Sequence, residues 1–154
     1  MHNWSKFWHL SRQERRQLSL SLISLPAAIL AVRLVGFRRW HSALAQITPL
    51  KTSPGSGPKS LMPQVRAAAR MVKVAAHYIP YATCVHQSLV LWWLLRRQGV
   101  ESDLRIGVRK DHGRQLGGHA WVELLGQALN DDENVHRRFS PLKHPAPPVG
   151  AKQL

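Results

Sequence analysis

The fold is decided by residues 81–99, YATCVHQSLVLWWLLRRQG, which contain the only cysteine of the chain. Thr83 is a favourable N-cap residue, and an arginine pair followed by Gly99 is typical of a helix C-terminus. The apolar residues between these ends recur at helical spacing: Val85, Leu89, Trp92 and Leu95. We therefore predict a largely buried helix that begins at Cys84.

The size of the chain and its cysteine content limit the possible classes. With 154 residues the chain can form one modest domain, and its single cysteine cannot form an internal disulfide. The N-terminus lacks the pattern of a signal peptide, so we expect a cytoplasmic protein. The longest apolar stretch, residues 18–32, is shorter than the roughly 20 residues of a spanning helix. We expect it to be a buried helix, with membrane-surface attachment as the minor alternative.

Helices are predicted on the N-terminal side. The sequence SRQE at residues 11–14 is a capping box, so a helix should follow it, restart at Pro26 and continue to about Gln46. Residues 48–60 have the Pro, Gly and Ser content of a linker, and residues 65–79 form an alanine-rich helical pattern.

Strands are predicted on the C-terminal side. Residues 102–110 and 119–125 alternate apolar and polar side chains, and Gly126 marks a turn into a short third strand. Helices followed by antiparallel strands indicate an α+β fold. The predicted parts are an apolar helical region (1–47), the linker (48–60), a core (61–144) and a flexible tail (145–154).

Three residues of this predicted core suit nucleophilic catalysis. A cysteine at a helix N-terminus is favoured as thiolate, and the free N–H groups there can bind an oxyanion. His119 on a strand could act as the base for Cys84, and Asp131 after the next turn could orient that histidine. Asp132 is the alternative to Asp131, and Tyr81 is a candidate second oxyanion donor. The competing interpretation of Cys84 is a small buried residue.

The charge of the chain and the spacing of potential metal ligands bear on other possible functions. The net charge of +14 is spread over short basic pairs, without a nucleic-acid motif. A basic surface attracts phosphate, acidic peptides or anionic lipid, so a non-enzymatic nucleic-acid-binding module stays open as an alternative. Cys84 and His86 are two potential zinc ligands, whereas a structural zinc site needs about four. We expect neither a metal nor a cofactor.

The segments LLRRQG, LRIGV and HAWVE, with Cys84 before them and Asp131 after them, resemble one peptidase family. This family is the transglutaminase-like leader peptidases of lasso-peptide biosynthesis, often called B proteins. The resemblance covers residues from about 68 to 142, and Val85 replaces a leucine that is common in the family. It implies a papain/transglutaminase-like core, in which the cysteine helix packs on an antiparallel sheet behind N-terminal helices.

The resemblance also implies a function. In the family, a triad equivalent to Cys84, His119 and Asp131 removes the leader from a ribosomally made precursor peptide, and an ATP-dependent cyclase then closes the macrolactam. Residues 1–46 predict helices, whereas the family's leader-recognition domain is rich in strands. The implied partners are therefore the precursor, a separate leader-recognition protein and the lasso cyclase. A transglutaminase-like amidase or acyltransferase would use the same triad and stays open as an alternative.

Overall fold

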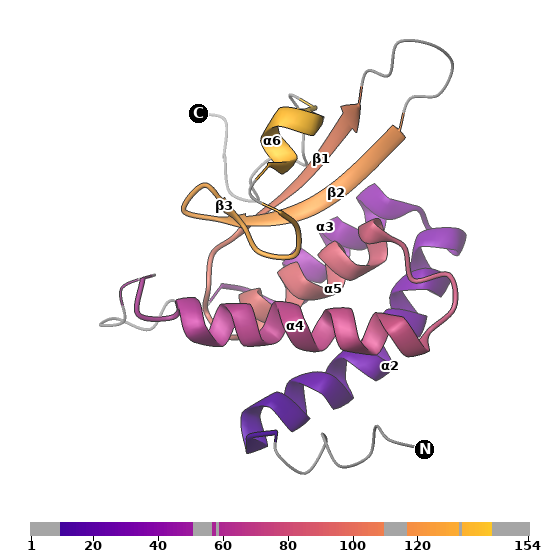
Figure 1. Cartoon of the computed structure of the whole chain (residues 1–154). Coiled ribbons are helices and arrows are strands. Elements are labelled where there is room, and N and C mark those ends of the chain that lie inside the picture. Colours follow the sequence, from indigo (N-terminus) through magenta and orange to yellow (C-terminus); the bar gives the residue numbers. More distant parts are fainter. Residues whose placement is uncertain (1–9, 51–56, 58, 110–116, 133, 143–154) are drawn as a thin grey trace, which may run out of the picture.

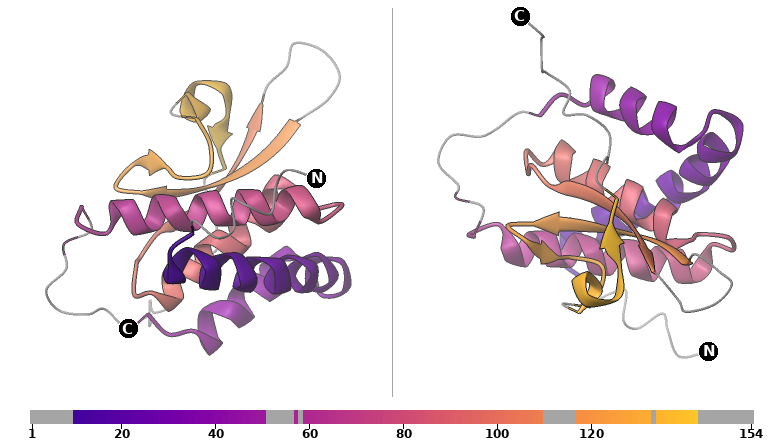
Figure 2. Two further views of the ribbon diagram at one scale, coloured as in Figure 1. Left: turned by 60° about the horizontal axis from the view of Figure 1, so that its bottom comes forward. Right: turned by 90° about the horizontal axis from the view of Figure 1, so that it is seen from above.

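The computed structural model describes residues 10–50, 57, 59–109, 117–132 and 134–142. Its elements are, in order, α2 (Arg12–Leu34), α3 (Phe37–Ile47), α4 (Met62–Tyr78), α5 (Cys84–Arg97), β1 (Asp103–Arg109), β2 (Gly117–Leu124), β3 (Gln127–Ala128), α6 (Val135–Arg138) and β4 (Ser140–Pro141). The antiparallel sheet has the strand order β3-β2-β1-β4. Helices α4 and α5 lie between this sheet and α2 (Figures 1 and 2). The predicted α+β class is therefore confirmed.

Helix α2 begins at the predicted capping box. The Ser11 N–H donates to Glu14 Oε2 over 2.9 Å, and the Glu14 N–H donates to Ser11 Oγ over 3.2 Å. The predicted restart at Pro26 is wrong, because α2 continues through this proline to Leu34. Pro26 cannot donate to the Leu22 carbonyl. Both residues lie on the exposed side of the helix, where water can hydrate that carbonyl.

The helical region after α2 is divided at Gly36. This glycine has a φ of +89°, a conformation that L-residues rarely adopt, and it separates α2 from α3. The prediction of continuous helix to about Gln46 missed this break. Helix α4 begins at Met62, three residues before the predicted start, and ends at Tyr78. Most of the predicted linker and the whole predicted tail lie outside the described residues.

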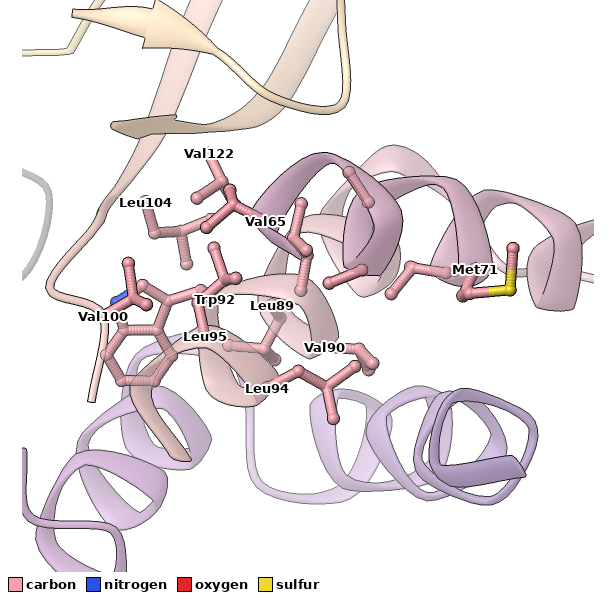
Figure 3. Close-up of a cluster of buried hydrophobic side chains, with 14 of the residues drawn as sticks. Val65, Met71, Leu89, Val90, Trp92, Leu94, Leu95, Val100, Leu104 and Val122 are labelled. Carbon is pink, nitrogen blue, oxygen red and sulfur yellow. The ribbon is translucent and has the colours of Figure 1, made fainter. Parts of the chain in front are cut away.

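Helix α5 has the predicted bounds and lies at the centre of the core (Figure 3). It packs against the other long helices and against β1 and β2. Its side chains Leu89, Leu91 and Leu95 are completely buried. Burial of one leucine side chain contributes about 1.5–3 kcal/mol, so this stripe fixes α5 firmly beneath the sheet. Val65 of α4 and Val122 of β2 belong to the same cluster.

The strands are close to their predicted positions. β1 pairs with β2 along its whole length, and this register places Gly107 opposite His119. Leu125 and Gly126 have φ values of 53° and 78°, as a two-residue type I′ turn requires, and they lead into β3. The predicted short third strand is therefore confirmed. Residues 110–116, which connect β1 to β2, lie outside the described part.

Candidate active site

Cys84 is the first residue of α5 and is partly exposed. The free N–H groups of the first helical turn surround this position, and they favour negative charge on a sulfur or an oxygen. His86 closes the same turn, because its Nδ1 accepts the Thr83 N–H over 3.3 Å and lies 2.9 Å from Thr83 Oγ1. Burial, followed by the charge of Arg33, lowers the pKa of His86. A neutral His86 therefore belongs to the helix cap.

His119 lies in the first half of β2, where two aromatic rings hold its imidazole. The His119 ring is stacked 4.8 Å from the Phe139 ring and 6.1 Å from the Trp121 ring, measured between centroids. Trp121 is itself completely buried, and its Nε1 donates to Glu123 Oε1 over 2.8 Å. This stacking restricts the orientation of His119.

Asp131 is the hydrogen-bond partner of His119. Its Oδ2 contacts His119 Nε2, and its Oδ1 accepts the Asp132 N–H and the Arg138 Nη2 group, at 2.6 and 3.1 Å. Burial raises the pKa of Asp131, but the Asp132 N–H, His119 and Arg138 together lower it below its usual value. The carboxylate therefore stays ionised and can orient the imidazole.

Asp131 lies outside the sheet, in the bend that follows β3. Asp131 and Asp132 follow β3 in a turn, so they do not alternate between the two faces of a sheet. Asp132 is exposed, and its backbone N–H supports Asp131. The geometry therefore selects Asp131 over Asp132 as the residue that contacts His119.

Two polar residues that were not predicted from the sequence, Ser88 and Asn130, connect the elements of this site by hydrogen bonds. Ser88 Oγ donates to the Ala120 carbonyl over 2.9 Å and accepts Asn130 Nδ2 over 2.8 Å. Asn130 Oδ1 accepts the Val122 N–H over 2.9 Å. Ser88 lies one turn after Cys84 on the same helix face, because residues i and i+4 align.

The other two groups of this network lie next to His119 and Asp131. Ala120 follows His119, and Asn130 precedes Asp131. The network therefore ties together the three segments that contain the predicted triad. The sequence signal for this network was limited to a serine within the apolar stripe of α5, and its burial is visible only in the structure.

The structure brings two of the three predicted catalytic residues into direct contact. His119 and Asp131 are hydrogen-bonded, whereas no hydrogen bond joins Cys84 to either of them within the described part of the chain. Helix α5 and strand β2 pack against each other, with the Ser88–Ala120 hydrogen bond between them. Among the described residues, no group of three or more His, Cys, Asp or Glu side chains could hold a metal ion.

Comparison with known proteins identifies the family. No curated protein and no solved structure matches the chain. The family model of the transglutaminase-like superfamily matches residues 28–144, which include Cys84, the His119–Asp131 pair and the whole described sheet. This match covers more than half of the chain, and the protein therefore belongs to the transglutaminase-like superfamily.

Proposed function

We propose that the protein is a cysteine peptidase that removes the leader from a lasso-peptide precursor. It acts in the cytoplasm with a separate leader-recognition protein and upstream of the ATP-dependent lasso cyclase. The observation that carries the proposal is the His119–Asp131 pair on a strand that packs against the helix opened by Cys84. Membership in a superfamily that includes cysteine peptidases supports the same chemistry.

The proposed reaction uses the nitrogen of His119 that faces away from Asp131. Because Asp131 engages Nε2, the Nδ1 atom takes the proton of Cys84, and the thiolate attacks the carbonyl at the leader–core junction. The Cys84 N–H holds the oxyanion with a second donor. His119 then protonates the departing core amine. Water hydrolyses the thioester, and the leader leaves with a free carboxylate.

Tyr81 is the candidate second donor. It lies three residues before Cys84, and its φ of 69° sets a sharp turn immediately before the helix cap. Its side chain is 78% exposed, so its hydroxyl is accessible to a bound peptide. In the proposed complex the hydroxyl donates to the oxyanion.

The test is cleavage of the precursor, followed by mass spectrometry. Cys84→Ala should abolish cleavage, and His119→Ala should slow it by about 10²–10⁴-fold, the usual contribution of a general base. Asp131→Asn should cost less, because Asp131 only orients the base. Asp132→Asn is the matched control and should cleave at the normal rate, because Asp132 is exposed and acts through its backbone. Unchanged cleavage by Cys84→Ala would remove the proposal.

An acyltransferase of the same superfamily would use the same residues. It would differ in the last step, where an amine instead of water attacks the thioester. Product analysis with and without an added amine separates the two reactions. An amide product that replaces the free leader carboxylate would favour the transferase.

The leader-recognition protein is proposed to bind the outer face of α2. The inner face of this helix packs into the core through Leu25 and Ala28. The outer face exposes Ile23, Leu30 and Leu34, with 72%, 59% and 75% of their surface accessible. An apolar stripe of this kind on a surface helix is typical of a protein–protein contact.

A further inference from the structure

A cavity of about 640 Å³ is lined by residues from the beginnings of α2 and α4 and from the end of α5. Cys84 lies at the opposite end of α5. Figure 1 shows how these helices are arranged. This volume lies within the usual range of ligand-binding pockets. Its polar lining consists of arginine and glutamine side chains: Arg12, Arg16, Arg97, Gln17, Gln64 and Gln98, together with Gln13. Leu20 and Leu94 complete the wall.

All charged side chains of the described wall are cationic. Arg12 and Arg16 are exposed and form no ion pair with a described acidic residue. Arg97 is held with its guanidinium 4.9 Å from the centroid of the Trp93 ring. None of these three guanidinium groups pairs with an acidic residue of the described part of the chain. Together they favour an anionic ligand, and their planar geometry matches carboxylates.

Gln17 provides a second, independent sign of a ligand. Its side chain is 4% exposed, and among the residues that the structure describes neither its amide nitrogen nor its amide oxygen has a hydrogen-bond partner. An unpaired buried amide is costly, so its position at the cavity wall indicates that a bound group completes it. A side-chain amide offers one acceptor and two donors, which match the C=O and N–H of a peptide bond.

We propose that this cavity binds an acidic segment of a peptide, with arginines on its carboxylates and glutamines on its backbone. Under the proposed function, on which this assignment of the ligand rests, the segment belongs to the leader of the precursor. Arg97 lies 13 positions after Cys84 (97 − 84 = 13), which corresponds to about 20 Å along α5. An extended peptide spans that distance with about six residues, so the acidic segment lies at least that far from the cleaved bond.

The test measures binding by fluorescence anisotropy, with full-length Cys84→Ala protein so that no cleavage interferes. The probe is a fluorescein-labelled glutamate-rich peptide, and its glutamine counterpart should bind at least about tenfold more weakly. Arg12→Gln combined with Arg16→Gln should weaken binding of the glutamate peptide by about tenfold. Arg38→Gln combined with Arg39→Gln removes the same charge from exposed positions on α3 and should leave binding nearly unchanged.

Gln17→Leu separates a binding role from a structural role. It removes an unpaired buried amide, so it should raise the Tm and at the same time weaken peptide binding by about threefold. The proposal would be overturned if the two double arginine variants weakened peptide binding equally. It would also be overturned if equimolar inorganic phosphate displaced the peptide. Because binding is measured without catalysis, its failure leaves the peptidase proposal intact. A failure of Cys84→Ala to stop cleavage leaves the cavity proposal for acidic peptides intact.

Discussion

At the scale of single residues, Asn130 has the largest structural role that the sequence does not reveal. Its side-chain amide bonds both Ser88 of α5 and the backbone of β2, and the next residue is Asp131. The position of the proposed triad therefore depends on one neutral amide. This amide helps to hold the segment after β3, in which Asp131 contacts His119.

Substitution Asn130→Ala tests this dependence. It leaves the Val122 N–H without its partner, at a cost of about 1–3 kcal/mol. It also removes the donor to Ser88 Oγ, whose own hydrogen bond to the Ala120 carbonyl remains. We expect a lower free energy of unfolding in urea, and a fall in kcat at temperatures where the variant is still folded. Asn134→Ala is the control, because Asn134 is exposed and its side chain makes no capping hydrogen bond. Equal effects of both substitutions would contradict the assigned role.

The residues of the site differ in whether they could be predicted from the sequence. Cys84, His119 and Asp131 could be chosen from local patterns and from a family resemblance. Ser88 and Asn130 could not, because their hydrogen bonds join positions 32 and 42 residues apart. The choice between Asp131 and Asp132 required the turn geometry, since an extended strand and a turn orient the two side chains differently.

At the scale of elements, the β1–β2 pair positions the proposed base. Gly107 lies opposite His119 in the register and beneath the Trp121 ring, against which His119 stacks. A Cβ atom at Gly107 would lie 2.8 Å from two atoms of that ring. Trp121 is completely buried and cannot move without disturbing His119.

We therefore expect Gly107→Ala to destabilise the protein by about 1–3 kcal/mol, the usual cost of overpacking. Cleavage should decrease as well, because a displaced Trp121 moves the His119 imidazole. Gly117→Ala changes the same residue type on the neighbouring strand, where the added Cβ meets nothing within 4 Å. Thermal unfolding and cleavage rates of both variants provide the comparison, and wild-type behaviour of Gly107→Ala would refute the argument.

The secondary structure itself was largely predictable from local chemistry. Helix α5 has a capping threonine, an apolar stripe and a C-terminal glycine that all agree, so its bounds matched the prediction. The prediction that the helix restarts at Pro26 was wrong, because the sequence pattern does not show which side of the helix is exposed to water. The carbonyl freed by the proline lies on the exposed side of α2, where hydration replaces the lost bond.

At the scale of the whole molecule, α2 has apolar residues on two opposite faces. By length and composition alone this helix could cross a membrane, and 28% of its most apolar window is buried inside the structure. Its inner residues Leu25 and Ala28 belong to the same cluster as α4 and α5. Transfer of α2 into lipid would therefore open the core, which favours a protein partner at the outer face.

Ile23→Ser combined with Leu30→Ser should weaken binding to the purified leader-recognition protein and leave the Tm nearly unchanged. The expected loss is at least tenfold in Kd, because each exposed side chain contributes about 1–2 kcal/mol when it becomes buried. Leu125→Ser at the β2–β3 turn, where the leucine is 58% exposed, controls for a general loss of surface apolarity. Two results together would assign the outer face of α2 to lipid: the double variant binds the leader-recognition protein as the wild type does, and the wild type floats with liposomes.

The single cysteine at the start of α5 allows the protein to be labelled at one known position without mutagenesis. Any thiol-directed reagent attaches at one position only, so the moles of label bound equal the moles of accessible Cys84. A fluorophore attached to Cys84 can also be used to measure distances by resonance energy transfer. Energy transfer from it to a labelled acidic peptide would give the separation between the two proposed sites, without a second engineered attachment point on the protein.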